Sequence, residues 1–328
     1  MYGCLKSARI FWEHLGSFLY KLGFNQNQYD LCVVNQEIDG STRTITWHVD
    51  DLKISHRSEA VVNDIIEALE KEYSKMTVTT GDRYTYCGMD LVYTNGEVQI
   101  GMTVYLKDTL SEFKYEDCRK KVNSQAALHL FNVNPKKLKL DDEKKTLFHK
   151  MIAKLLFVSK QGRSDIQVAI AFLTTRLSDP DIDDWKKLAR LMRYINSTTN
   201  LKFRFSIQDF RAIKWWVDTS YAVHPITCSH TSGTFTLRRG SIYSSSIKQK
   251  FIAKSSTEAE CIALNNIARQ IIWTQNFLQD QGYNTGPSTI HQDNKSTILL
   301  AENGIMSSSK WTKYINVHYY FIKDRINR

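Results

Sequence analysis

Residues 44–56 run TITWHVDDLKISH, and this stretch decides how the first part of the chain folds. Apolar side chains alternate with polar ones as far as Val49, which is the pattern of a strand with one buried face. The pair Asp50-Asp51 interrupts the alternation, and a second short run over 52–55 follows it. We therefore predict two strands joined at an acidic tip.

The sequence on either side of this hairpin predicts a mixed α/β protein. Apolar residues at three- and four-residue steps indicate helices, whereas alternation next to turn dipeptides such as Asn95-Gly96 indicates strands. We expect helices over 5–22, 58–73, 142–177, 183–196, 256–281 and 312–326, and strands over 30–36, 42–49, 52–55, 83–93, 97–105, 212–218, 231–238, 240–246 and 288–293. The region 118–145 is expected to be an irregular connection.

The composition is that of a globular protein with a substantial core, because 42% of its 328 residues are hydrophobic and 24% are charged. No apolar run approaches the roughly 20 residues needed to span a bilayer, and the N-terminus lacks a signal-like apolar segment. We therefore expect a cytoplasmic or nuclear protein that has no membrane partner. The six cysteines form no C-x-x-C pair and are expected to be free thiols.

The net charge of +10, from 44 basic and 34 acidic side chains, favours a polyanionic partner. The alternative is ordinary surface charge that maintains solubility. Composition alone does not distinguish the two.

The acidic tip, Asp50-Asp51, is the first candidate metal site. Carboxylate oxygens are hard ligands that suit Mg²⁺, which usually also needs substrate phosphates or a further carboxylate. The alternative is a solvated turn. The apolar residues on both sides of the pair make it less free than an ordinary surface loop.

A second candidate site comprises Asp218, Glu260 and Asp293. Two of these residues end predicted strands, and the third lies near the start of a predicted helix. Three carboxylates brought together would require cations, and two Mg²⁺ ions about 4 Å apart can assist phosphodiester cleavage. Each residue also has a local alternative: Asp218 as a turn former, and Asp293 as the N-cap of the next helix.

The choice of Glu260 over Glu258 follows from helix geometry. The sequence 255–258, SSTE, fits a capping box that gives Glu258 a local role. Glu260 instead heads the apolar stripe of Ala263, Leu264, Ile267, Ile271 and Leu278. A carboxylate on a packed face needs a partner or a metal ion, so we assign Glu260 to the site.

In this order, the motifs resemble the Pol polyprotein of copia-type LTR retrotransposons over nearly the whole chain. Residues 1–24 resemble the segment that leads into a reverse-transcriptase palm, 44–56 its catalytic hairpin, and 85–91 (TYCGMDL) the strand after it. Residues 148–195 resemble thumb and connection helices. The motifs IKWWVDTSYAVH (213–224), KSSTEAECIAL (254–264) and HQDNKSTILL (291–300) resemble the first three acidic motifs of an RNase H domain, and 313–326 the helix after them.

The resemblance implies three parts: a partial reverse-transcriptase palm over 1–120, thumb and connection helices over 121–205, and an RNase H-like mixed sheet with helices over 206–328. It also implies a third palm aspartate, which neither Asp30 nor Asp39 replaces, so we do not expect polymerase activity. The family's RNase H domain has a further strand and a helix with a fourth carboxylate. Asp324 lies on a different helix, and we do not assign that role to it.

The implied activity is Mg²⁺-dependent cleavage of RNA in an RNA–DNA hybrid by Asp218, Glu260 and Asp293, with a two-metal site. A basic surface should contact the hybrid. The candidate contacts, whose alternative is a solvated basic face, are Arg238, Arg239, Lys248, Lys250 and Lys254. One alternative function is a catalytically inactive remnant that binds nucleic acid. Another is a decayed fragment without a stable fold.

Overall fold

The computed structural model describes residues 5–113, 121–207 and 213–303, which fall into two compact units. The first unit comprises the described residues of 1–87 together with 272–285, and the second those of 88–271 together with 286–328. Both contain helices and sheets, so the expected mixed α/β class is confirmed. The predicted helix over 312–326 lies outside the described residues.

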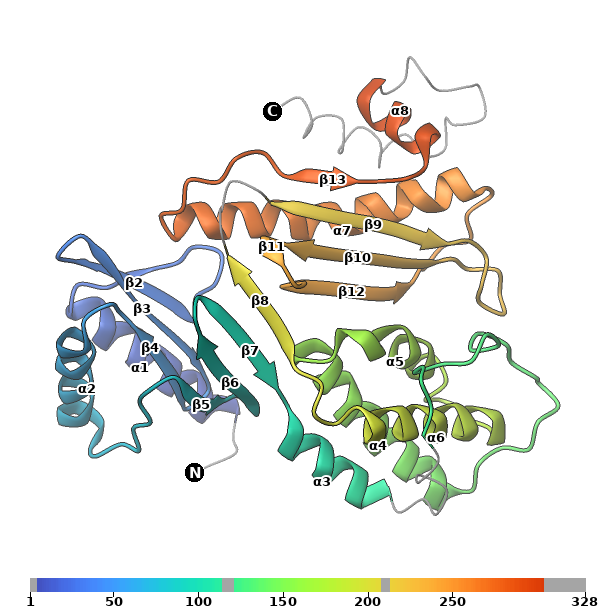
Figure 1. Ribbon diagram of the computed structural model, residues 1–328, viewed down its shortest axis with the longest axis horizontal. Coiled ribbons are helices and arrows are strands. Elements are labelled where there is room, and N and C mark those ends of the chain that lie inside the picture. Colours follow the sequence, from blue (N-terminus) through green and yellow to red (C-terminus); the bar gives the residue numbers. More distant parts are fainter. Residues whose placement is uncertain (1–4, 114–120, 208–212, 304–328) are drawn as a thin grey trace. The chain divides into compact units, whose positions relative to one another are not determined.

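The first unit is built around an antiparallel sheet of order β1-β2-β3-β4 (Figure 1). Its strands are β1 (Asn25–Gln26), β2 (Val33–Ile38), β3 (Ser41–His48) and β4 (Asp51–Ser55). The helices α1 (Leu5–Lys21) and α2 (Glu59–Tyr73) share one apolar core with the sheet. Its buried side chains are Leu15, Leu19, Phe24, Val34, Ile45, Trp47, Ile65 and Leu69. The predicted hairpin at the acidic tip is therefore confirmed.

The C-terminal part of the long helix α7 (Ser256–Asp280) also belongs to the first unit. Buried Asn27 donates through Nδ2 to the Phe277 carbonyl at 3.4 Å. The Trp273 indole donates to the Tyr29 carbonyl at 3.0 Å. The segment after β1 is thus bound to this end of the helix.

The second unit contains a mixed sheet of order β12-β10-β9-β13 (Figure 1). The strands β9 (Lys214–Ser220), β10 (His230–Thr236) and β12 (Tyr243–Lys248) are antiparallel, and β13 (Thr289–His291) runs parallel to β9. The N-terminal part of α7 follows β12 along the chain, and α8 (Lys295–Asn303) follows β13. The expected mixed sheet is present, with β13 shorter than the predicted strand over 288–293.

A separate antiparallel set of strands in this unit differs from the prediction. It comprises β6 (Met89–Thr94), β7 (Glu97–Gly101), β8 (Phe203–Ile207) and β11 (Arg238–Arg239). The predicted strand over 83–93 is wrong, because left-handed Cys87 and Gly88 (φ 48° and 73°) separate β5 (Arg83–Tyr86) from β6. The strand β8 was not predicted, and the end of the expected strand over 97–105 is instead the start of α3 (Thr103–Phe113).

The predicted single helix over 142–177 is also wrong. It is divided into α4 (Asp142–Gln161), a 3₁₀ turn at Ser164–Ile166 and α5 (Gln167–Thr174), whereas α6 (Ile182–Ser197) agrees with expectation. The break at Gly162 lets buried Arg163 form a bidentate ion pair with Asp165, at 2.8 and 2.9 Å. These helices and α3 enclose a continuous apolar core. Within the described ranges, no helix has the length and apolarity required to cross a membrane.

Two buried imidazoles lie next to each other: His230 begins β10, and His224 lies in the connection between β9 and β10. His224 Nε2 is 3.0 Å from His230 Nδ1, and His230 Nε2 is 2.7 Å from Ser246 Oγ. The Phe131 ring contacts both imidazoles, with centroid distances of 4.9 and 5.5 Å. Burial lowers the pKa of His230 to about 4. Burial, together with the nearby His230 and Lys248, lowers the pKa of His224 to about 4 as well.

These histidines should make the second unit sensitive to acid. Because the folded pKa lies below the unfolded value of 6.5, the stabilisation is complete above pH 6.5 and is lost as the pH falls toward 4. We expect a loss of roughly 2 kcal/mol per imidazole between pH 7 and pH 5. The variant His230→Asn should be less stable at pH 7 but have a flatter pH dependence. Urea unfolding at several pH values measures both, and equal pH slopes would contradict this explanation.

Helix α7 approaches β10 closely at Gly233. A Cβ atom at this position would lie 2.5 Å from Ile267 Cδ1 and 2.8 Å from its Cγ1, so a side chain cannot fit without movement of Ile267. The predicted apolar stripe of α7, which includes Ile267, is buried. Glycine at position 233 therefore permits the helix to pack against the sheet.

The substitution Gly233→Ala should destabilise the protein by about 1–3 kcal/mol, because the added methyl group overfills the contact. The matched control is Gly101→Ala, where the nearest atoms would lie 3.8 Å from the new Cβ. The substitution Ile267→Ala should lower the free energy of unfolding by less in the Gly233→Ala background than in the wild type. Chemical unfolding of the four variants measures this coupling, and strictly additive effects would argue against the steric explanation.

Candidate metal centre

The structure brings the three predicted carboxylates of the second unit together. Asp218 lies on β9, Glu260 on the second turn of α7, and Asp293 just after β13. Carboxylate oxygens of these residues all lie within 4.8 Å of one another. The parallel pairing of His291 with Trp216 explains part of this geometry, because two further residues along each strand lead to Asp293 and Asp218.

Glu260 reaches the sheet because the first turn of α7 is hydrogen-bonded to the strands. The Ala259 carbonyl accepts from Thr219 Oγ1 at 3.3 Å and from Gln249 Nε2 at 2.8 Å. Gln249 also donates to Thr231 Oγ1 at 3.0 Å. Ala259, which precedes Glu260, is therefore hydrogen-bonded directly to Thr219, which follows Asp218.

Glu260 is the buried member of the carboxylate cluster, since the residue is only 6% exposed. Burial raises the pKa of its carboxyl group, and the nearby Asp218 and Asp293 raise it further, whereas a hydrogen bond from Gln292 Nε2 at 3.2 Å lowers it. Asp218 and Asp293 are exposed. An oxygen-rich, negatively charged group of this kind fits a divalent cation such as Mg²⁺.

The local alternative for Asp293 is occupied by its neighbour, whereas Asp218 also makes a local hydrogen bond, accepting from the Thr219 backbone N–H at 2.8 Å. Asn294 Oδ1 accepts from the Thr297 backbone at 3.0 Å, so Asn294, not Asp293, caps α8. Glu258 accepts from the Lys254 backbone N–H at 2.7 Å, and the Glu258 N–H donates to Ser255 Oγ at 3.2 Å. The local capping role predicted for Glu258 is confirmed, although its carboxylate bonds Lys254 instead of the N-cap residue.

Gln292 holds the carboxylate of Glu260 and was not predicted from the sequence. Its Nε2 donates to Glu260, and its Oε1 accepts from the Asn294 backbone at 3.0 Å. Its place directly before Asp293 was the available signal. An amide at the end of a strand, however, has many other uses.

The pair Asp50-Asp51 lies in the first unit and is exposed at the β3–β4 turn. His48 pairs with Asp51, so Val49 and Asp50 form the turn, with Val49 at φ 57°. A β-branched residue in the left-handed region is strained, which favours a functional turn over an ordinary solvated one. Within the described ranges, no third acidic or thiol ligand joins this pair in a metal-binding group.

The predicted basic contacts divide into two sets. Arg238 and Arg239 form β11, which pairs with β8, and Arg239 makes an ion pair with Glu97 at 2.7 Å. Lys248 ends β12, while Lys250 and Lys254 lie in the loop between β12 and α7. Lys250 and Lys254 are thus basic residues of the connection that leads to Glu260.

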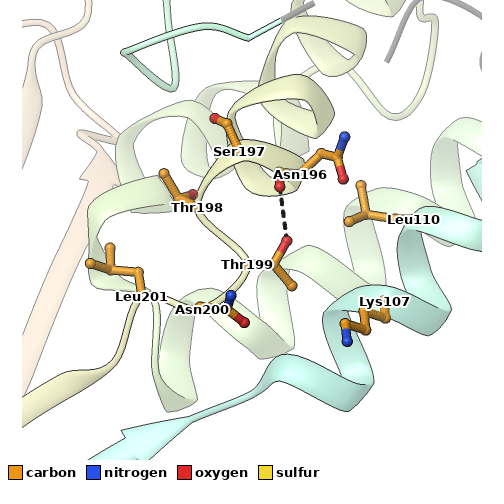
Figure 2. A pocket seen from close by; sticks show the side chains of 8 residues that line it. All are labelled: Lys107, Leu110, Asn196, Ser197, Thr198, Thr199, Asn200 and Leu201. Carbon is orange, nitrogen blue, oxygen red and sulfur yellow. Dashed lines mark hydrogen bonds between the residues drawn. The ribbon is translucent and has the colours of Figure 1, made fainter. Parts of the chain in front are cut away.

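A hollow of about 740 Å³ lies elsewhere in the second unit, at the C-terminal end of α6 (Figure 2). It is lined by Lys107, Leu110 and residues 196–201. Thr199 Oγ1 donates to the Asn196 carbonyl at 3.0 Å, which satisfies the helix end. This lining contains no carboxylate, imidazole or thiol group, and the carboxylate cluster therefore remains the better candidate site.

The chain is similar along its length to transposon Pol polyproteins. The retrovirus-related Pol polyprotein from transposon TNT 1-94 of Nicotiana tabacum is 24% identical over 336 residues, covering 100% of this chain and 25% of the polyprotein. The corresponding polyprotein from transposon RE2 of Arabidopsis thaliana is 22% identical over 328 residues, covering 99% of this chain and 22% of its own length. The chain thus spans about a quarter of these relatives.

A shorter relative is matched over most of its length. The putative transposon Ty5-1 protein of Saccharomyces cerevisiae is 25% identical over 285 residues, covering 83% of this chain and 87% of that protein. No protein-family model matches the chain.

The carboxylate cluster predicts a metal-dependent change in stability. Without divalent cations, Glu260→Gln should raise the Tm of the second unit, because it removes a buried charge that faces two other carboxylates. Mg²⁺ at ten times its Kd should stabilise the folded wild type by about 1.4 kcal/mol and thereby raise its Tm. It should have much less effect on the Tm of the variant. Differential scanning calorimetry with EDTA or Mg²⁺ measures both, with Glu302→Gln as control. Equal Mg²⁺ effects in all three proteins would disprove binding at the cluster.

Proposed function

We propose that the second unit cleaves the RNA strand of RNA–DNA hybrids in a Mg²⁺-dependent reaction. The observation that carries the proposal is the convergence of Asp218, Glu260 and Asp293, whose oxygens lie within 4.8 Å of one another. The setting is also the one that the resemblance to an RNase H domain implies. Three antiparallel strands are followed by α7 and a parallel fourth strand.

The residues of the cluster have different roles in this proposal. Asp218 and Asp293 are exposed and would present oxygens to the cations from the solvent side, where a phosphodiester can approach. Buried Glu260 would supply an oxygen from the protein side, and Gln292 would hold its carboxylate in place. When bound, Mg²⁺ would polarise the phosphate and stabilise the charge on the attacking and leaving oxygens.

The similarity to retrovirus-related Pol polyproteins supports a retrotransposon-derived protein, with nucleic acid as its partner. We do not extend the proposal to polymerisation. Within the described ranges, Asp50 and Asp51 are two exposed carboxylates without a third acidic ligand beside them. Their strained turn is consistent with a palm hairpin, which is the part of a polymerase site that the resemblance implies.

The proposal is tested with a labelled RNA–DNA hybrid, the purified chain and Mg²⁺. The wild type should shorten the RNA strand and leave the DNA strand intact, and EDTA should stop the reaction. The variant Asp293→Asn should lower the rate by at least about 100-fold, since it removes a metal ligand that faces the substrate. Glu302→Gln, on the exposed side of α8, should retain the wild-type rate.

Cleavage that persists at the wild-type rate in Asp293→Asn would show that the cleavage does not depend on this carboxylate, and would disprove the assignment of the site. A folded wild type that binds the hybrid without cleaving it would favour the alternative of a catalytically inactive nucleic-acid-binding protein.

A further inference from the structure

The loop over 249–255 connects β12 to α7 and is fixed at both ends beside the carboxylate cluster. At its start, Gln249 is only 1% exposed, and its amide donates to Ala259, the residue before Glu260. The Gln249 backbone N–H also donates to the Ser229 carbonyl at 2.9 Å. At its end, the Lys254 backbone N–H donates to Glu258. The loop therefore has a defined position at the start of α7.

This loop exposes apolar side chains that have no role in the core. Phe251 is 67% exposed and Ile252 is 60% exposed. Tyr221, which follows β9, is 44% exposed, and its hydroxyl donates to the Ala253 carbonyl of the loop at 3.4 Å. One hydrogen bond thus joins two loops at the same end of the sheet, and both loops expose large apolar side chains near it. Exposed apolar groups clustered in this way indicate an interaction site.

The charges around this surface indicate its partner. Lys250 and Lys254 are exposed and flank Phe251 and Ile252 along the loop. Cations alternating with aromatic or apolar side chains fit a nucleic-acid strand, because the cations neutralise phosphates while the flat groups contact sugars and bases. A protein or lipid partner would not explain why this surface adjoins a carboxylate cluster suited to phosphodiester chemistry.

We propose that Tyr221, Phe251 and Ile252, together with Lys250 and Lys254, form a nucleic-acid-binding rim beside the carboxylate cluster. This inference rests on the proposed function, since it names the residues that hold the hybrid at the site. Phe251 and Ile252 contact the sugars or bases of one strand, and the two lysines contact its phosphates. Arg238 and Arg239 are not part of the rim, because they belong to β11 and pair with β8.

The rim is tested by the salt dependence of hybrid binding. Fluorescence anisotropy with a labelled RNA–DNA hybrid is measured between 50 and 300 mM salt at fixed Mg²⁺, using the full chain with Asp293→Asn so that the probe is not cleaved. Adding Phe251→Ala and Ile252→Ala should weaken binding about tenfold at every salt concentration, because an apolar contact releases no counterions. Adding Lys250→Gln or Lys254→Gln should instead reduce the slope of log Kd against log salt by about one each.

Two matched controls separate the rim from general surface effects. Leu138→Ala removes an apolar side chain of similar exposure (73%), and Lys136→Gln removes an exposed lysine, both in the segment before α4. Neither should change affinity or slope. In the same Asp293→Asn chain, Phe251→Tyr keeps the aromatic ring and should therefore retain most of the affinity for the hybrid that Phe251→Ala loses.

The rim is disproved if the Phe251 and Ile252 substitutions leave affinity unchanged, or if the controls weaken binding equally. It is also disproved if Phe251→Tyr binds as weakly as the alanine variant. Failure of the proposed function is a separate result, because it requires that the wild type does not cleave a hybrid. If the chain binds the hybrid through the rim but does not cleave it, the rim is supported and the proposed cleavage activity is contradicted.

Discussion

The carboxylate cluster depends on the close packing of α7 against β9 and β10. Gly233 allows Ile267 to approach the sheet, and the Ala259 carbonyl accepts hydrogen bonds from both β9 and the start of the loop after β12. These contacts fix the N-terminal part of a 25-residue helix relative to the sheet. Glu260 can therefore be carried by a helix while Asp218 is carried by β9 and Asp293 follows β13, and the three still meet.

The same packing places a charge where it opposes folding. Glu260 is buried next to two carboxylates, and among the described side chains the amide of Gln292 is its hydrogen-bonding partner. A fold that required only stability would place an apolar residue here, as at the neighbouring stripe positions of α7. The divalent cation that we propose for the cluster would offset this charge. The rim beside it similarly keeps Phe251 exposed, although a buried phenylalanine would contribute more to stability.

Much of the fold and the site was predictable from the sequence, because the signals are local. Alternation predicted the β3–β4 hairpin, helical spacing predicted α1, α2 and α7, and the contrast between Glu258 and Glu260 followed from which face of α7 is apolar. The failures are mainly non-local. The strand β11 is recognised only through its partner β8, which lies some thirty residues earlier in the chain. Gln292 likewise acquires its role only when β13 lies beside β9.

The short pairing of β13 has an evolutionary consequence. Only three residues, Thr289–His291, align β13 with β9. Asp293 of the carboxylate cluster and Asn294, which caps α8, follow almost at once. Insertions or deletions in the loop between α7 and β13 can change the length of that loop without moving Asp293. A single inserted or deleted residue between His291 and Asn294 would exchange amide and carboxylate positions. Length changes among relatives should therefore accumulate before β13 and be rare immediately after it.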